Sequence, residues 1–225
     1  MPEIRALIFD MDGVIIDSNP LHRIAWSEYM RRHGIEMTEA MQQRMYGKRN
    51  DEIVRDFFGD RAGVQLSDAE VFAHGAAKEA LYREMMGPRI EESLVPGIRD
   101  FLARHRNRDL AVATNAEPAN VDFVLDQSGL RPFFRVIVNG HQVTHPKPHP
   151  EVYLRAAQGL QAPPENCIVF EDSYTGVASG LAAGMRVVGV ETTHCDLPGV
   201  SLAIRDFNDP ALEAWLLTPL ENRPR

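Results

Sequence analysis

Short, continuous apolar runs that end at polar residues recur along this chain of 225 residues and limit the folds open to it. Such a run is typical of a strand buried on both faces, as in a parallel sheet. Helical patterns separate the later runs, and this alternation predicts an α/β fold with a doubly wound, Rossmann-like parallel sheet. The expected strands cover residues 6–9, 110–113, 135–138, 167–170 and 186–190, with a weaker one at 200–204. The expected helices cover residues 98–105, 119–128, 150–157 and 176–183.

A long segment after the first strand departs from this alternation. It shows helical periodicity and no convincing strand, and residues such as Leu21 and Ala25 share one apolar helical stripe. We therefore expect two domains. The core comprises residues 1–18 and 94–225, and an all-helical cap is inserted between them as residues 19–93.

Composition and charge exclude several classes of protein. Hydrophobic residues make up 44% of the chain and charged residues 25%, which excludes a disordered or collagen-like chain. The net charge of −8 argues against nucleic acid or an anionic membrane as the main partner, whereas a small phosphorylated ligand needs only a local positive site. The two cysteines, Cys167 and Cys195, are too few for a disulfide framework. Because no apolar run is long enough to span a membrane and the N-terminus lacks a secretory pattern, we expect a cytoplasmic protein.

Polar side chains follow several of the expected strands at the point where each strand ends. The carboxyl ends of parallel strands meet at one edge of a sheet, and open α/β sheets bind ligands there. Residues that are far apart in the sequence should therefore converge at this edge. They are Asp10, Asp12, Thr114, Asn115, Glu171 and Asp172, with Glu191 a weaker case.

Several carboxylates held close together repel each other unless a cation lies between them. All-oxygen ligands favour Mg²⁺ over Zn²⁺, and an acidic site with Mg²⁺ suits a phosphate oxyanion. Taken alone, Asp10 and Asp12 could mark an ordinary turn after a strand. Because Glu171, Asp172 and Lys147 follow later in the sequence, the ordinary turn is the weaker interpretation. One of the two aspartates can face a phosphorus atom while the other reaches the entering or leaving oxygen.

These motifs, in this order, resemble those of the haloacid dehalogenase superfamily, in its β-phosphoglucomutase-like branch with a helical cap. The resemblance covers essentially the whole chain. It rests on the segment 9–18 (FDMDGVIIDS), on Thr114, on Lys147 in a Lys-Pro-x-Pro context, and on Glu171-Asp172-Ser173 followed by Gly176.

The resemblance implies a role for each core residue. Asp10 would be the nucleophile that becomes an aspartyl phosphate, and Asp12 would be the general acid/base. Mg²⁺ would be held by Asp10, by the main-chain carbonyl of Asp12, by Asp172 directly and by Glu171 through water.

Three further core residues would hold the transferring phosphoryl group. They are Thr114, Lys147 and the backbone N–H of Asn115. A positive charge and short hydrogen-bond donors are what the phosphoryl transition state needs.

Within the cap, the resemblance implies a substrate-binding role for His22 and Lys78. The arginine that mutases carry on their substrate loop falls on Asn50 in this chain, with Lys48 and Arg49 just before it. Each of these residues could equally be a solvated helix or loop side chain. The missing arginine favours a phosphatase over a mutase.

The leading hypothesis is a Mg²⁺-dependent phosphatase that acts on a small phosphorylated metabolite, a sugar phosphate, and works as a monomer. The alternative is a β-phosphoglucomutase, in which a sugar hydroxyl rather than water takes up the phosphoryl group. A catalytically silent binding protein is a third possibility. Dehalogenase and phosphonatase chemistry are set aside because those enzymes lack the second aspartate, which is Asp12 here.

Overall fold

The computed structural model describes residues 4–45, 50–59, 63 and 65–218. The chain forms two compact units. The core unit comprises the chain up to Ser18 and from Ile90 onward, and the helical unit runs from Asn19 to Arg89. Lys48 and Arg49 lie outside the described residues.

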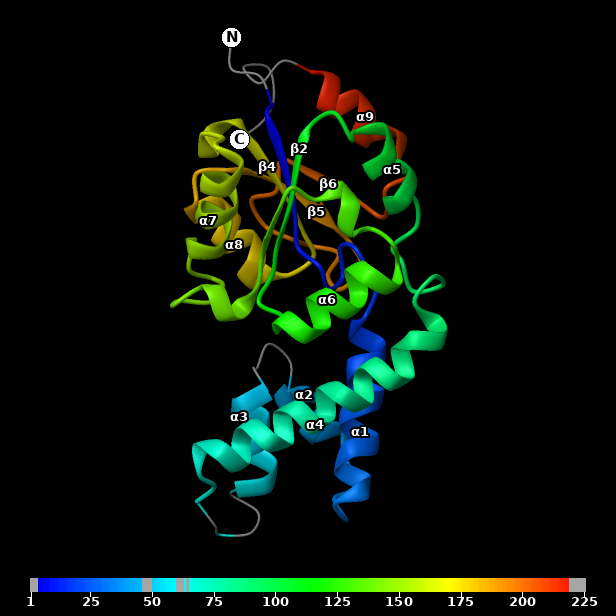
Figure 1. Cartoon of the computed structure of the whole chain (residues 1–225), viewed down its shortest axis with the longest axis vertical. Helices are drawn as coiled ribbons and strands as arrows, with labels where there is room; N and C mark the ends of the chain where they lie inside the picture. Colours follow the sequence, from blue (N-terminus) through cyan, green and yellow to red (C-terminus); the bar gives the residue numbers. More distant parts are fainter. Residues whose placement is uncertain (1–3, 46–49, 60–62, 64, 219–225) are drawn as a thin grey trace. The chain divides into compact units, whose positions relative to one another are not determined.

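The core unit is built on a six-stranded sheet with the order β3-β2-β1-β4-β5-β6, and neighbouring strands are parallel (Figure 1). The α/β fold expected from the sequence is confirmed, as is the helical insertion after the first strand. The chain passes from β1 to β2 and β3 on one side and then crosses to β4 on the other, so strand order reverses next to β1. The strands are β1 (Ala6–Phe9), β2 (Asp109–Ala113), β3 (Val136–Val138), β4 (Cys167–Glu171), β5 (Arg186–Val190) and β6 (Leu202–Ile204).

Helices cover both faces of the sheet, and β1 and β4 are therefore buried along their whole length. Figure 1 shows α7 and α8 on one face, with α5 and α9 on the other. On the α5 and α9 face, the ring of Phe9 stacks on Phe170 with centroids 4.7 Å apart, and Phe101 and Phe207 close over the pair. The helices of this unit are α5 (Ile98–Arg104), α6 (Pro118–Gln127), α7 (Glu151–Leu160), α8 (Tyr174–Ala182) and α9 (Pro210–Leu217).

The register of the central strands determines what lies beside the end of β1. Phe9 is level with Val112 of β2 and with Phe170 of β4. The next residues along these strands therefore emerge together, and Asp10 N donates to the carbonyl of Phe170 at 3.0 Å.

The helical unit has its own apolar core, formed by residues such as Trp26, Met30, Val54 and Leu81. Its longest helix begins with a capping box, in which Ser67 and Glu70 each bond the backbone N–H of the other. Its helices are α1 (Asn19–Arg32), α2 (Glu39–Met45), α3 (Asn50–Val54), a π-helical turn (Arg55–Gly59) and α4 (Asp68–Met86).

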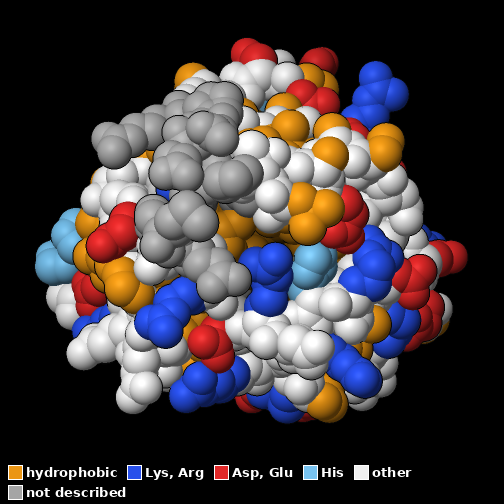
Figure 2. Space-filling view, turned by 90° about the horizontal axis from the view of Figure 1, so that it is seen from above, with side chains coloured by type: hydrophobic (Ala, Val, Ile, Leu, Met, Phe, Trp, Pro, Cys, Tyr) orange, Lys and Arg blue, Asp and Glu red, His pale blue; other side chains and the backbone are white. Residues whose placement is uncertain are grey.

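The surface seen in Figure 2 carries basic and acidic side chains next to one another. Within the core unit, Arg99 pairs with Glu91 and Arg135 with Asp109, each at 2.9 Å. Among the described residues, no helix combines the length and the apolar character needed to cross a membrane.

Candidate active site

Three buried carboxylates meet at the carboxyl edge of the sheet. Asp10 follows β1, Glu171 is the last residue of β4, and Asp172 comes next. One carboxylate oxygen from each lies within 4.8 Å of the other two. Exposure is 8% for Asp10, 0% for Glu171 and 3% for Asp172, so water screens their charges poorly.

Burial and mutual repulsion raise the pKa of two of these groups. Burial raises the pKa of Asp10 from 3.8 to about 7, with Lys147 opposing the rise and Glu171 and Asp12 adding to it. The pKa of Asp172 is raised to about 8, chiefly by burial and also by the charges of Glu171 and Asp10. Three clustered carboxylates of this kind fit a hard cation with oxygen ligands, such as Mg²⁺.

Gly13 lets the backbone after β1 pass directly over Asp172. It has a φ of +77°, and a β-carbon at this position would lie 1.9 Å from Asp172 Oδ2. Two threonines after β5 hold this arrangement. Thr192 Oγ1 donates to the carbonyl of Gly13 at 2.6 Å, and the hydroxyl of Thr193 donates to Asp172 Oδ2.

Asp12 is half-buried and lies on the same turn. The hydroxyl of Ser18, which is fully buried, donates to Asp12 Oδ1 at 2.5 Å. This contact fixes one carboxylate oxygen of Asp12.

Lys147 joins two of the three carboxylates. Its Nζ lies 2.9 Å from Asp10 Oδ1 and 2.6 Å from Glu171 Oε1. Burial alone would lower the pKa of Lys147, but Asp10 and Glu171 outweigh burial and raise the pKa. The lysine therefore stays charged beside Asp10.

The two polar residues after β2 have separate contacts. Thr114 is buried, and its Oγ1 accepts from Ala116 N at 3.1 Å. Asn115 Oδ1 accepts from Lys147 N at 3.2 Å, which attaches the lysine segment to the end of β2. The sequence assigned Asn115 a role through its backbone, so this side-chain contact is an additional finding.

Tyr153 is a contact of this cluster that the sequence interpretation missed. Its hydroxyl donates to Glu171 Oε1 at 2.7 Å, and Lys147 Nζ lies 4.8 Å from its ring centroid. Burial raises the pKa of Tyr153 well above 10, and the charges of Glu171 and Asp10 add to this, so the phenol remains a hydrogen-bond donor. The residue lies on the buried stripe of α7, where the sequence pattern indicates only core packing.

A separate polar cluster in the helical unit contains three of the residues expected to bind substrate. Lys78 Nζ lies 3.0 Å from His22 Nδ1 and donates to Glu79 Oε1 at 2.6 Å. Asn50 Nδ2 donates to the same Glu79 oxygen at 2.6 Å. Lys78 and Glu79 are both buried, and the His22 ring stacks on Tyr82 with centroids 3.8 Å apart. Glu79 was not expected from the sequence.

A second group with metal-ligand side chains, His145, His149 and Glu151, lies before and at the start of α7. Glu151 already accepts from the backbone N–H groups of Thr144 and His145 and forms an ion pair with Arg155. These backbone hydrogen bonds lower the pKa of Glu151 to about 2. We therefore assign Glu151 to bracing this loop.

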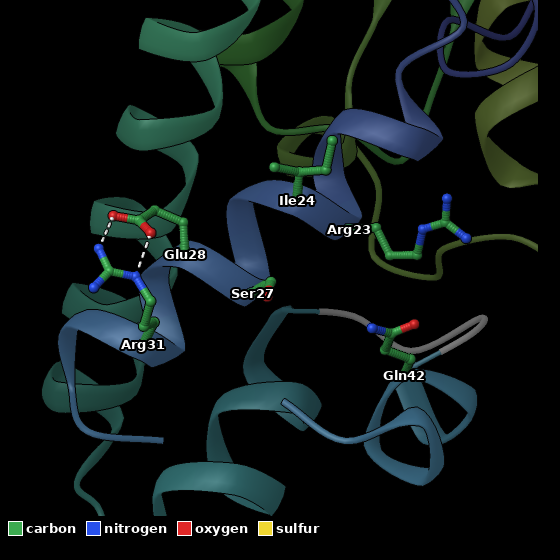
Figure 3. Close-up of a pocket in the computed structure, with 6 residues that line it drawn as sticks. All are labelled: Arg23, Ile24, Ser27, Glu28, Arg31 and Gln42. Carbon is green, nitrogen blue, oxygen red and sulfur yellow. Dashed lines mark hydrogen bonds and ion pairs between the residues drawn. The ribbon is translucent and has the colours of Figure 1, made fainter. Parts of the chain in front are cut away.

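A pocket of about 290 Å³ lies in the helical unit along α1 and α2 (Figure 3). One of its cationic residues, Arg31, is engaged by Glu28, at 2.8 Å from Nε. None of the core carboxylates lines it, so the chemistry of the protein is better sought at the acidic cluster. The lining residues are Arg23, Ile24, Ser27, Glu28, Arg31 and Gln42.

The sheet is parallel with this strand order, a helical insertion follows β1, and carboxylates gather where the strand order reverses. Together these features define a haloacid dehalogenase-like fold. The family model for haloacid dehalogenase-like hydrolases matches residues 4–184. The chain belongs to the haloacid dehalogenase superfamily, subfamily IA, in the branch of the β-phosphoglucomutase-like and CbbY-like proteins. The resemblance found in the sequence is thereby confirmed.

Three relatives illustrate the range of this branch. Protein CbbY of Rhodobacter capsulatus is 36% identical, with 94% of this chain and 95% of that protein covered. Fructose-1-phosphate phosphatase YqaB of Escherichia coli is 33% identical, with 82% and 95% covered. The crystal structure of β-phosphoglucomutase from Clostridium difficile has a TM-score of 0.80 at 27% identity, with 94% and 95% covered.

Proposed function

We propose that this protein is a Mg²⁺-dependent phosphatase that acts on a small sugar phosphate through an aspartyl-phosphate intermediate. The observation that carries the proposal is the buried carboxylate of Asp10, 2.9 Å from Lys147 and clustered with Glu171 and Asp172. The sugar-phosphate class is supported by relatives such as fructose-1-phosphate phosphatase, which is 33% identical.

In the first step, an oxygen of ionised Asp10 attacks the phosphorus and the bond to the sugar oxygen breaks. Asp12 gives its proton to the departing oxygen, so the sugar leaves as a neutral alcohol. In the second step, Asp12 takes a proton from water, which attacks the phosphorus of the aspartyl phosphate. Inorganic phosphate leaves and the carboxylate of Asp10 is restored.

Bound Mg²⁺ would neutralise the charge that the phosphoryl oxygens and the carboxylates bring together. Asp10, the main-chain carbonyl of Asp12 and Asp172 would hold it directly, and Glu171 would hold it through water. The protein's own cation, Lys147, would hold the phosphoryl oxygens together with Thr114 and the backbone N–H of Asn115.

We assign the part of the substrate beyond the phosphate to the helical unit, as the cap domain of the enzyme. Its candidate contacts are His22, Asn50 and Lys78, whose side chains lie in one cluster. Lys48 and Arg49 remain candidates from the sequence alone. We further propose that the protein is a cytoplasmic monomer whose partner is this small metabolite rather than nucleic acid or a membrane.

The second candidate function is that of a β-phosphoglucomutase. It is favoured by the 3.0 Å contact between Lys78 and His22 and by the similarity to a β-phosphoglucomutase structure. Asn50 stands where the mutases carry an arginine, and this favours the phosphatase.

The test is phosphate release from a panel of sugar phosphates, with Mg²⁺ and with a chelator. We expect Mg²⁺-dependent release from at least one sugar phosphate, and none from folded Asp10→Asn protein. Formation of glucose 6-phosphate from β-glucose 1-phosphate without phosphate release would identify the mutase instead. A folded wild-type protein that does neither would support a silent binding protein.

A further inference from the structure

Tyr153 is a buried residue that contacts two members of the active-site cluster. Its hydroxyl contacts Glu171 and its ring contacts Lys147. Its exposure is 0%, and its ring belongs to the apolar core between the sheet and α7. The hydroxyl nevertheless points to Glu171 Oε1, 2.7 Å away. Because the phenol has no exposed surface, any effect on the reaction must act through its neighbours.

The side chain of Glu171 accepts hydrogen bonds on both carboxylate oxygens. Its Oε1 accepts from Lys147 Nζ at 2.6 Å and from the Tyr153 hydroxyl. Its Oε2 accepts from Asp172 N at 3.0 Å, from Ser173 N at 3.1 Å and from Ser173 Oγ at 3.1 Å. Five donors of the protein therefore converge on the two oxygens of this carboxylate. Glu171 is therefore built to stay in one orientation.

The space around Glu171 reinforces this orientation. A β-carbon at Gly176 would lie 1.7 Å from Glu171 Oε1, so only glycine lets α8 approach this closely. The Lys147 ammonium is shared between Glu171 and Asp10, at 2.6 Å and 2.9 Å. It also lies 4.8 Å from the centroid of the Tyr153 ring, within the range of a cation–π contact.

Tyr153 thus contacts both partners of the Lys147–Glu171 ion pair. Its hydroxyl supplies the second donor to Glu171 Oε1. Without that donor, Lys147 Nζ would be the only one of these two donors left on Glu171 Oε1. The carboxylate would then attract the ammonium more strongly and draw the lysine away from Asp10. The ring below the ammonium limits the positions to which Nζ can move.

We propose that Tyr153 is a positioning residue that fixes Glu171 through its hydroxyl and Lys147 through its ring. In this way it holds the Glu171 carboxylate in the orientation that suits cation binding, and it holds the Lys147 ammonium beside Asp10. The effect on turnover rests on the proposed function, whereas the effect on Mg²⁺ binding does not require a substrate.

The experiment compares wild type, Tyr153→Phe and Tyr153→Leu. The matched control is Tyr29→Phe, which removes the hydroxyl of a buried tyrosine that contacts His74 Nδ1 in the helical unit. Mg²⁺ affinity is measured by titration calorimetry on protein whose folding is verified by circular dichroism, and kcat and KM are measured for any substrate found. Loss of an outer contact to a metal ligand typically costs 10–100-fold in affinity or activity.

For Tyr153→Phe we expect Mg²⁺ affinity to fall about 10-fold, and kcat to fall similarly with little change in KM. Tyr153→Leu should lose more, because it also removes the ring below Lys147. Tyr29→Phe should bind Mg²⁺ as wild type does. Wild-type Mg²⁺ affinity in folded Tyr153→Phe would overturn the proposal.

A second measurement distinguishes positioning from a general structural effect. If Tyr153 acts through Glu171, its hydroxyl should matter much less once that carboxylate is gone. The Tyr153→Phe change should therefore have little further effect on Mg²⁺ affinity in a Glu171→Gln background. Fully additive losses would overturn the proposal. If wild type hydrolyses no phosphate ester, the proposed function fails while both Mg²⁺ titrations still decide the role of Tyr153.

Discussion

Gly13 and Asp172 occupy contiguous space at the end of the sheet: a β-carbon on the glycine would lie 1.9 Å from Oδ2 of the aspartate. One residue follows the first strand and the other follows the fourth, so this contact fixes the backbone of one acidic motif against the side chain of the other. Even the smallest substitution at this glycine would therefore reach the acidic cluster.

Gly13→Ala should therefore disturb the cluster as well as the backbone. A residue other than glycine at a left-handed φ costs about 1–2 kcal/mol. The matched control is Gly184→Ala, which has the same φ of +77° and no heavy atom of the described chain within 4 Å of its β-carbon. We expect both variants to unfold more easily in urea, and only Gly13→Ala to lose Mg²⁺ affinity in calorimetry. Equal Mg²⁺ affinity in the two variants would contradict the tight contact.

The stability of the metal-free protein should fall as pH rises. Burial raises the pKa of Asp10 to about 7 and of Asp172 to about 8, against an ordinary value of 3.8. Between about pH 4 and pH 8 the folded state therefore holds protons that the unfolded state has released, and the free energy of unfolding decreases with pH. Mg²⁺ competes with these protons, so its stabilising effect should be larger at pH 8 than at pH 5.

The measurement is urea unfolding at both pH values, with Mg²⁺ and with a chelator. A metal-free protein that becomes more stable from pH 5 to pH 8 would be inconsistent with protons held in the cluster. The Asp172→Asn variant is the matched comparison, since it should lose much of both the pH dependence and the Mg²⁺ effect.

Asp12→Asn should separate the two chemical steps. Loss of a general acid/base typically lowers the rate about 10²–10⁴-fold. With p-nitrophenyl phosphate, whose leaving group needs no proton, the first step should persist and the second should stall. We expect a burst of about one nitrophenolate per protein, followed by slow turnover, in a stopped-flow assay. Steady turnover at the wild-type rate would remove Asp12 from the acid/base role.

Glu79→Gln should destabilise the helical unit, because it leaves the charge of buried Lys78 without its closest anion. Breaking a buried ion pair on one side costs about 3–5 kcal/mol, and the nearby His22 should keep the loss toward the lower end of that range. The control is Glu28→Gln, which breaks the surface pair with Arg31 and should have little effect. The comparison is made by thermal and urea unfolding, and similar losses in the two variants would refute the role of Glu79.

The sheet was predictable because its signal is local. Each strand is a short apolar run followed by a polar residue, and parallel strands bring those residues to one edge. The sequence bounds for the first and fifth strands agree with the structure. The fourth strand runs one residue further, to Glu171, and the sixth begins only at Leu202.

The side chains that orient the cluster were not predictable from such signals. Tyr153 lies on an apolar helical stripe, so its pattern is that of core packing. Neighbours on a helix do not normally face each other, so the contact between Lys78 and Glu79 has no sequence pattern. Thr193 follows β5 as one polar loop residue among several, and only the fold brings it to Asp172.

The position of β1 at the centre of the sheet also bears on how the chain assembles during synthesis. This strand leaves the ribosome before the other five strands of the sheet, but its two neighbours begin only at Asp109 and Cys167. The helical unit, which is contiguous in sequence, can become compact while the first strand still lacks both partners. Native pairing of β1, and with it the joining of the acidic motifs, must therefore wait until β2 and β4 have been made.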